Sequence, residues 1–112
     1  MDCIFCKIIA NEIPSKKVYE DDLVVAFHDI QPVAPVHVLV IPKKHIPSVL
    51  DLREEDTPYL AAIHSAIQTI ANQLGLSEEG FRVITNTGKH GQQTVFHLHY
   101  HVIGGRQLNW TM

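Results

Sequence analysis

The sequence lacks long hydrophobic runs and a strong charge of either sign. Its apolar stretches, such as residues 23–27 and 38–41, are far too short to span a bilayer. The N-terminus also lacks the basic start and apolar stretch of a secretory signal. A membrane partner is therefore not expected, and the sequence predicts a protein of the cytoplasm. The formal net charge of −3 argues against nucleic acid as a partner, because nucleic-acid binding usually needs a basic surface.

Repeats, low-complexity segments and linkers are also missing from the 112 residues. We therefore expect a single domain, residues 1–112. A hydrophobic fraction of 46% with a low net charge excludes intrinsic disorder. The unusual count is that of histidine, with eight residues. Imidazole is costly to bury without partners and titrates near neutral pH, so the positions of these histidines decide what they can do.

Local patterns predict two helices and five strands. Residues 3–10 are expected to form a short helix, and a proline at position 14 prevents it from continuing. A long helix is expected over residues 58–74, with Thr57 as its N-cap, because apolar residues recur every three or four positions. Strands are expected at residues 17–20, 23–28, 36–41, 81–86 and 94–103. This order indicates an α+β fold with an antiparallel five-stranded sheet packed under the long helix.

A row of three histidines in the last expected strand is the strongest local signal. Alternate side chains of a strand point to opposite faces, so His97, His99 and His101 are expected to share one face. The opposite face is apolar and is expected to pack under the long helix; it consists of Phe96, Leu98, Tyr100 and Val102. Neutral imidazoles in such a row can chelate zinc, or one of them can attack phosphorus as a nucleophile. The residues by themselves leave both chemistries open.

Two cysteines near the N-terminus form a Cys-x-x-Cys pair, Cys3 and Cys6. A disulfide between them is disfavoured in a cytosolic protein. Two interpretations remain, a reduced pair that awaits a metal ion and a pair of buried thiols without a chemical role.

The pattern His-x-His-x-His followed by two apolar residues, here residues 97–103, resembles the signature of the histidine triad (HIT) superfamily. Similarity to its Hint branch extends over nearly the whole chain, at residues 29–30, 34–37, 41–45, Asn86, 91–94, 104–107 and Trp110. The resemblance implies a HIT-like fold and a homodimer whose two sheets join into one. It also implies hydrolysis of purine nucleoside 5′-phosphoramidates and related nucleotidyl conjugates, so the expected partner is a purine nucleoside monophosphate or its phosphoramidate. No cofactor is implied for catalysis.

The resemblance also implies roles for five residues. His99 is the expected nucleophile, which attacks the α-phosphorus to give a nucleotidyl-histidine that water then cleaves. His101 serves the phosphate and the leaving group, and His97 helps to fix the geometry of the nucleophile. His37 matches a fourth active-site histidine. Thr94 stands where a hydroxyl can hydrogen-bond the departing amine.

A nucleotide site follows from the same resemblance. Asp29 is expected to accept hydrogen bonds from both ribose hydroxyls, although on its own it would be a turn residue. The base is expected to lie among Phe5, Ile8, Phe27 and Ile30, which would otherwise be ordinary core residues. The residues expected at the phosphate are Asn86, Gln92, Gln93, Thr94, Val95, His99 and His101, with backbone N–H groups of 92–95 among the donors.

The chain departs from the Hint pattern at Gln92, where the branch usually has glycine. Glutamine fits there only if the backbone has a negative φ. The chain also ends in Trp110-Thr111-Met112 and lacks the usual proline-rich tail. Substrate preference and the role of the tail therefore stay open.

The resemblance adds a possible structural zinc site. Several bacterial HIT proteins bind zinc through such a Cys-x-x-Cys pair and two histidines, and the matching ligands here are Cys3, Cys6, His45 and His97. Two other functions remain open, a nucleotide-binding regulatory module with negligible turnover and a zinc-dependent hydrolase that uses the histidine row as ligands. The other histidines, His28, His64 and His90, are expected to be incidental.

Overall fold

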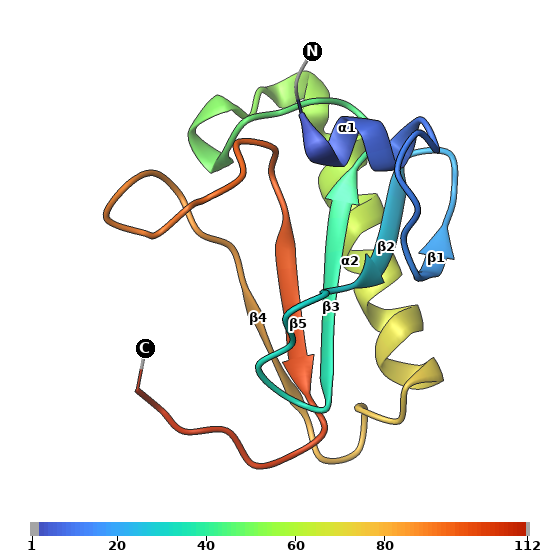
Figure 1. The fold of residues 1–112 in the computed structure, drawn as a ribbon, viewed down its shortest axis with the longest axis vertical. Helices are drawn as coiled ribbons and strands as arrows, with labels where there is room; N and C mark the ends of the chain where they lie inside the picture. The colour runs from blue at the N-terminus through green and yellow to red at the C-terminus, as the bar shows by residue number, and fades with distance from the viewer. Residues whose placement is uncertain (1–2, 112) are drawn as a thin grey trace.

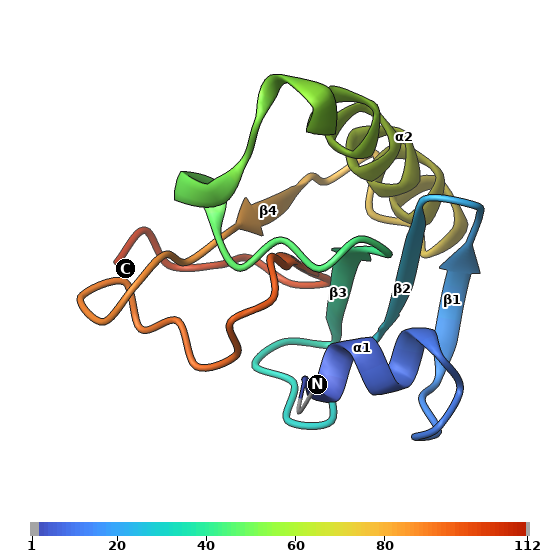
Figure 2. The same cartoon turned by 90° about the horizontal axis from the view of Figure 1, so that it is seen from above.

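The structure is a computed structural model that describes residues 3–111, in which one sheet carries a helix on each face (Figure 1, Figure 2). The sheet is antiparallel, with strand order β1-β2-β3-β5-β4. The strands are β1 Lys17–Glu20, β2 Val24–His28, β3 Val36–Pro42, β4 Phe81–Ile84 and β5 Tyr100–Gly104. The helices are α1 Ile4–Ile9 and α2 Thr57–Gln73, with short 3-10 helices at Val49–Asp51 and Glu54–Asp56. The predicted α+β fold, with one long and one short helix, is confirmed.

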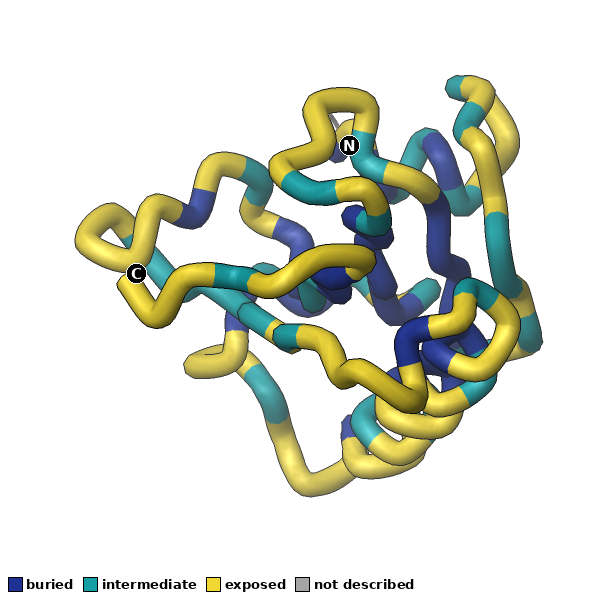
Figure 3. Tube along the Cα trace, turned by 90° about the horizontal axis from the view of Figure 1, so that it is seen from below, coloured by how far each residue is buried: buried dark blue, intermediate teal, exposed yellow. Residues whose placement is uncertain are grey.

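Neighbouring residues of the central strands face opposite layers of the molecule. The side chains that pack toward α2 are Val24, Ala26, Val38 and Val40. Those that pack toward α1 are Val25, Phe27, Leu39 and Ile41. A strand buried on both faces is apolar throughout, which explains the continuous hydrophobic runs of β2 and β3. Buried positions accordingly gather in the central strands and the inner face of α2, and exposed positions in the loops (Figure 3).

The long helix begins with a 3-10 turn that the sequence pattern did not predict. The N-cap is Asp56, so the expectation that Thr57 has this position is wrong. The hydroxyl of Thr57 instead donates to the Glu54 carbonyl at 2.6 Å. The Asp56 carboxylate accepts the Arg53 N–H at 3.0 Å and pairs with the Lys44 ammonium at 2.5 Å. The preceding turn runs directly into α2, which leaves Thr57 inside the helix. In the described part of the chain, no helix is long and apolar enough to cross a membrane.

The strand that carries the histidine row is shorter than the predicted 94–103. Pairing with β3 begins only at Tyr100, because the chain bends at residues 95–97. Leu98 lies ahead of the ladder and donates its N–H to the Ile46 carbonyl at 2.6 Å. The expectation that Phe96 packs under the long helix is wrong, since the bend leaves this residue 58% exposed.

The loop between β4 and β5 holds a non-glycine residue in the left-handed region. Gln92 has a φ of 60°, so the negative φ that would suit glutamine is not found. The N–H of Gln92 donates to the Lys89 carbonyl at 3.1 Å, which closes the turn. The preceding Gly91 is required by space, because a Cβ there would lie 2.6 Å from the carbonyl oxygen of Thr87.

Replacing Gln92 with glycine is expected to raise the free energy of unfolding by about 0.5–1 kcal/mol. The left-handed conformation costs an L-residue roughly 1–2 kcal/mol, and the extra freedom of glycine in the unfolded chain offsets part of the gain. Urea unfolding followed by circular dichroism measures the change. Gln92→Ala is the matched control because it removes the side chain and keeps the strain. Equal stability of the two variants would contradict this explanation.

Candidate active site

Three histidines meet on the sheet face that α1 covers. His37 lies on β3, His101 lies on β5, and His99 immediately precedes β5. The ring centroids of His99 and His101 are 5.1 Å apart, and the same separation joins His37 and His101. The row survives outside the strand ladder, because side-chain alternation needs only an extended backbone.

The nucleophile predicted from the sequence, His99, has its tautomer fixed by a backbone carbonyl. Its Nδ1 donates to the His97 carbonyl oxygen at 2.7 Å. A carbonyl can only accept, so Nδ1 carries the proton and Nε2 carries the lone pair. The ring is 6% exposed, and the edge of Phe5 packs against it with centroids 5.1 Å apart and planes at 83°. In the neutral ring of His99, Nε2 is thus an oriented nitrogen that carries the lone pair.

A second chain of hydrogen bonds fixes His37 and His101. The Val33 N–H donates to Nδ1 of His37 at 3.2 Å, so the proton of that ring is on Nε2. Nε2 of His37 donates in turn to Nδ1 of His101 at 2.9 Å, which leaves the proton of His101 on Nε2. Asp29 lies beside this pair, with Oδ2 3.4 Å from Nε2 of His37. The site therefore combines a nitrogen with a lone pair, Nε2 of His99, and an N–H donor, Nε2 of His101.

Burial keeps this pair neutral at pH 7. It lowers the pKa of His37, against the opposing effect of the Asp29 carboxylate. Burial, followed by the neighbouring rings of His99 and His37, lowers the pKa of His101 to about 4. Neutral rings agree with the hydrogen-bond chain, in which each ring has one donor and one acceptor nitrogen.

The lowered pKa of His101 predicts a loss of stability in mild acid. The unfolded ring titrates near 6.5, so its contribution is complete above about pH 6.5 and falls as the pH drops toward 4. The full shift corresponds to about 3 kcal/mol, and the half-buried position of the ring reduces this to about 1–2 kcal/mol. Urea unfolding between pH 7 and pH 4.5 measures the slope. A His101→Asn variant is expected to flatten it, and an unchanged slope would contradict the assignment.

A separate cluster joins α1 to the loop after β3. It consists of the Cys3, Cys6, His45 and His97 side chains, whose ligand atoms all lie within 4.8 Å of one another. The Nδ1 atoms of His45 and His97 are 3.2 Å apart. The Sγ atoms of Cys3 and Cys6 lie 3.4 and 3.6 Å from Nδ1 of His97. A tetrahedral zinc site with Zn–N near 2.0–2.1 Å and Zn–S near 2.3 Å has edges of about 3.3–3.8 Å, so the spacing fits this ion.

The electrostatics of the cluster also fit a cation. Nε2 of His97 donates to the Pro42 carbonyl at 2.8 Å, so its Nδ1 lone pair points into the cluster, as an outer hydrogen bond does for a metal-bound histidine. Burial, and then the Cys3 thiol, raises the pKa of Cys6 to about 11. A bound cation reverses this effect, because a thiol that coordinates zinc loses its proton.

A second group of candidate metal ligands lies near the nucleophile, but its hydrogen bonds suit proton transfer better than metal binding. One ligand atom each from Asp29, His37 and His101 lies within 4.8 Å of the others. The Val33 N–H occupies the Nδ1 lone pair of His37, so the proton is on the nitrogen that faces the other two groups. A metal ion there would have to displace that proton and break the bond to Val33. These three groups are arranged for proton transfer.

Comparison with known proteins adds independent evidence. The HIT domain family matches residues 10–108. The chain belongs to the HIT domain family. A purine nucleoside phosphoramidase from Escherichia coli K12 is 50% identical over 107 residues, which are 96% of this chain and 90% of that protein. The match covers most of the predicted domain, and the exact bounds 1–112 stay a prediction.

Solved structures of HIT proteins have the same fold. A histidine triad protein from Clostridium difficile is 52% identical, with a TM-score of 0.96 over 100% of this chain and 97% of that chain. A HIT family hydrolase from Legionella pneumophila is 46% identical, with a TM-score of 0.95 over 97% of both chains. Together with the relative from E. coli, these structures support the assignment of this chain as a nucleotide hydrolase.

The structure revises one part of the phosphate site expected for a HIT protein. The side chain of Gln93 is buried, and its amide donates to the Pro47 and Val95 carbonyls at 2.7 and 3.1 Å. The backbone N–H groups of Gln92 and Gln93 also donate within the loop. The backbone N–H groups of Gln92 and Gln93 and the side-chain amide of Gln93 therefore stabilise the loop and are not available to a phosphate. Of the backbone N–H groups predicted to bind the phosphate, those of Thr94 and Val95 remain candidates, and Thr94 is exposed.

The expected nucleoside residues fall into two groups. Three of them are buried between α1 and the sheet, namely Phe5 and Ile8 of α1 and Phe27 of β2. Asp29 and Ile30 lie on the loop after β2, where Ile30 is 95% exposed. Oδ1 of Asp29 accepts the Gln31 N–H at 2.8 Å, and Oδ2 faces His37. Asn86 is half-buried beyond the end of β4. The contacts of all these residues with a nucleotide stay predictions.

Sequence reasoning missed the backbone groups that orient the histidines. Val33, Pro42 and the His97 carbonyl each bind one imidazole nitrogen. The hydroxyl of Thr85 also donates to the His99 carbonyl at 3.0 Å. Backbone partners leave no trace in residue types, so no pattern could have indicated them. The missed groups are nevertheless the ones that set the tautomers.

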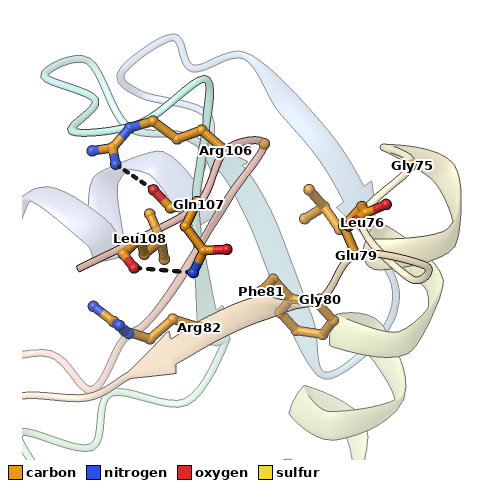
Figure 4. Close-up of a pocket in the computed structure, with 10 residues that line it drawn as sticks. Gly75, Leu76, Glu79, Gly80, Phe81, Arg82, Arg106, Gln107 and Leu108 are labelled. Carbon is orange, nitrogen blue, oxygen red and sulfur yellow. Dashed lines mark hydrogen bonds between the residues drawn. The ribbon is translucent and has the colours of Figure 1, made fainter. Parts of the chain in front are cut away.

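A pocket of about 450 Å³ lies at the end of the sheet where α2 ends, apart from the histidines (Figure 4). Leu76 and Phe81 are its apolar residues near α2, and Arg82 and Arg106 reach in from β4 and the segment after β5. Both guanidinium groups donate to backbone carbonyls, Arg82 to Asn109 and Arg106 to Val33 and Gln107. The pocket contains none of the predicted site residues.

Proposed function

We propose that the protein hydrolyses purine nucleoside 5′-phosphoramidates and related nucleotidyl conjugates through a covalent nucleotidyl-histidine on His99. The observation that carries this proposal is the His99 Nδ1 hydrogen bond to the His97 carbonyl, which leaves Nε2 free to attack. The phosphoramidase name of a relative that is 50% identical supports the substrate class.

The first step replaces the P–N bond of the substrate with a bond from phosphorus to Nε2 of His99. The ring then carries positive charge, which the His97 carbonyl stabilises through Nδ1. The anionic phosphate favours protonation of the His37–His101 pair, and this pair supplies the proton with which the amine leaves. The N–H groups of Thr94 and Val95 hold the phosphate oxygens, and the Thr94 hydroxyl receives the departing amine.

The second step returns the enzyme to its starting state. Water attacks phosphorus, the bond to Nε2 of His99 breaks, and the nucleoside monophosphate leaves. The proton lost by water goes to the His37–His101 pair, which replaces the one given to the amine. Asp29, 3.4 Å from Nε2 of His37, stabilises the protonated pair. The same carboxylate has a second predicted role at the ribose hydroxyls.

We also propose the assembly and the metal implied by the family resemblance. β4 is an edge strand that exposes Phe81 and Val83, which are 37% and 40% accessible, and this supports two copies that join their sheets there. Cys3, Cys6, His45 and His97 would hold a structural zinc ion, which supplies no catalytic chemistry. We also propose that the protein is located in the cytoplasm.

Assays of the purified protein distinguish this function from its two alternatives. The proposed hydrolase releases AMP from adenosine 5′-phosphoramidate and, in a rapid quench, gives adenylyl-His99. A regulatory binding module would bind AMP without releasing it from any conjugate. A zinc-dependent hydrolase would release AMP without a covalent intermediate. Absence of the adenylyl-enzyme during turnover would therefore refute the covalent mechanism.

A further inference from the structure

One residue belongs to both the Cys/His cluster and the active site. The ring of His97 directs Nδ1 into the cluster, and the backbone carbonyl of the same residue accepts the Nδ1–H of His99. The ring is completely buried and is fixed at its other nitrogen by the Pro42 carbonyl. A displacement of the whole of His97 therefore also moves the carbonyl that sets the tautomer of His99.

A second contact joins the same two sites through α1. Phe5 lies between the cysteines, and its ring packs edge-on against His97 and His99 at centroid distances of 5.9 and 5.1 Å. Cys3 is the N-cap of α1, where its Sγ accepts the N–H of Cys6 at 3.2 Å. The cysteines thus help to position α1, and α1 carries the Phe5 ring that packs against His99.

A cation at the centre of the cluster would stabilise this arrangement of its four ligand atoms. The Nδ1 atoms of His45 and His97 approach to 3.2 Å, and Nδ1 of His97 presents a lone pair because its Nε2–H is bonded to Pro42. A coordinated ion attracts both nitrogens and both sulfurs at once. Without the ion, His97 keeps its bond to Pro42 and α1 keeps its packing on the sheet, but no single group attracts all four ligand atoms to one point.

We propose that zinc bound by the Cys/His cluster positions the nucleophile, so that His99 reacts faster when the cluster is loaded, although the ion touches no substrate. His97 and Phe5 are the positioning residues that transmit this effect. The kinetic consequence of this proposal depends on the function proposed above. The ion has a closed set of four protein ligands, so it offers no open position for water or phosphate.

The test compares zinc-loaded and metal-stripped protein at a temperature where circular dichroism shows both to be folded. The first readout is the ¹⁵N spectrum of the histidine rings, which reports the tautomer of His99 without any turnover. We expect a single Nδ1–H tautomer in the loaded protein and a mixture in the stripped protein. The second readout is single-turnover adenylylation of His99, which is expected to fall by about 10–100-fold on stripping, with little change in KM.

Replacing zinc with another metal ion distinguishes a positioning role of the ion from a catalytic one. Co²⁺ and Cd²⁺ have different Lewis acidities, so a catalytic ion would give widely different rates. A positioning ion is expected to give rates within about threefold of zinc, since only the geometry of the four ligands matters. Restoration of the rate by zinc, but not by magnesium, completes the test.

Two variants of α1 cover the case in which the stripped protein does not stay folded. Phe5→Leu keeps the metal ligands and removes the ring contact, so it is expected to lower the adenylylation rate more than it raises KM. Ile4→Ala, at a half-exposed position of the same helix, is the matched control and is expected to leave both unchanged.

Three outcomes would overturn the proposal. They are an unchanged His99 tautomer after stripping, an unchanged adenylylation rate in the folded stripped protein, and a Phe5→Leu variant that changes only KM. If the loaded wild type does not cleave phosphoramidates at all, the proposed function fails. The ring spectra and the Phe5→Leu variant's tautomer then still decide whether the cluster positions His99.

Discussion

A His99→Ala variant is expected to lose turnover of adenosine 5′-phosphoramidate by about 10⁴-fold or more in kcat, because the covalent step has no other nucleophile. The other rings cannot replace it. Nδ1 of His101 already accepts from His37, and Nδ1 of His97 faces the Cys/His cluster. Binding of AMP is expected to stay within a few-fold, because most of the predicted ribose and phosphate contacts are made by other groups. Stopped assays for AMP release and calorimetric titration with AMP measure the two quantities.

His28→Ala is the matched control for this variant, since His28 is an exposed histidine at the end of β2. It is expected to keep wild-type kcat and KM. Added imidazole is expected to restore part of the activity of His99→Ala, because a small nucleophile can enter the space left by the ring. Substantial turnover in His99→Ala without imidazole would rule out the covalent mechanism.

The histidine row shows why part of this site could be predicted from residue types. The expected strand 94–103 is wrong in its first half, yet His97, His99 and His101 still lie on one face. Side-chain alternation depends on an extended backbone, whereas a strand also needs a partner at hydrogen-bond distance. The sequence pattern reports the first condition, and tertiary contacts decide the second. The exposed Phe96 marks the position where the backbone stops following the pattern.

The roles of individual nitrogens could not be predicted in the same way. The two candidate metal groups have similar residue types, with two histidines each. Nδ1 of His97 presents its lone pair to a cation because the Pro42 carbonyl accepts a hydrogen bond from Nε2–H. In His37 the Val33 N–H occupies Nδ1, so a proton lies on Nε2. Backbone groups brought close by the fold therefore decide which cluster suits a metal and which suits proton transfer.

The turn at Gln92 illustrates another limit of structure prediction from local sequence. A glycine-rich loop predicts left-handed backbone, but it does not say which residue adopts it. Here Gly88 and Gln92 adopt it, at φ of 70° and 60°, and Gly91 is needed because it has no side chain. The side chain of Gln93, expected at the phosphate, is used to fix this turn to Pro47. Local sequence thus predicts a loop at the site, and packing decides which of its groups face the substrate.

Removing zinc from the Cys/His cluster is expected to lower the free energy of unfolding by about 4 kcal/mol or more, because a ligand at 1,000 times its Kd stabilises the folded state by that amount. The corresponding fall in Tm is about 15 °C for a domain of this size. The core under α2 contains none of the four ligands, so the stripped protein is expected to stay folded at low temperature. The segments that loosen should be α1 and the loop that carries His45, since metal ligation joins them to His97.

Calorimetry of the zinc-loaded protein with and without a chelator measures this effect, and hydrogen exchange locates it. A Cys3→Ser, Cys6→Ser double variant is the control. It is expected to have the low Tm of the stripped protein and to be insensitive to the chelator, because a serine hydroxyl is a poor zinc ligand. Zinc binding should also weaken below neutral pH, since the thiols must lose their protons to coordinate. An equal Tm with and without chelator, in protein shown by elemental analysis to have carried zinc, would contradict a structural role for the ion.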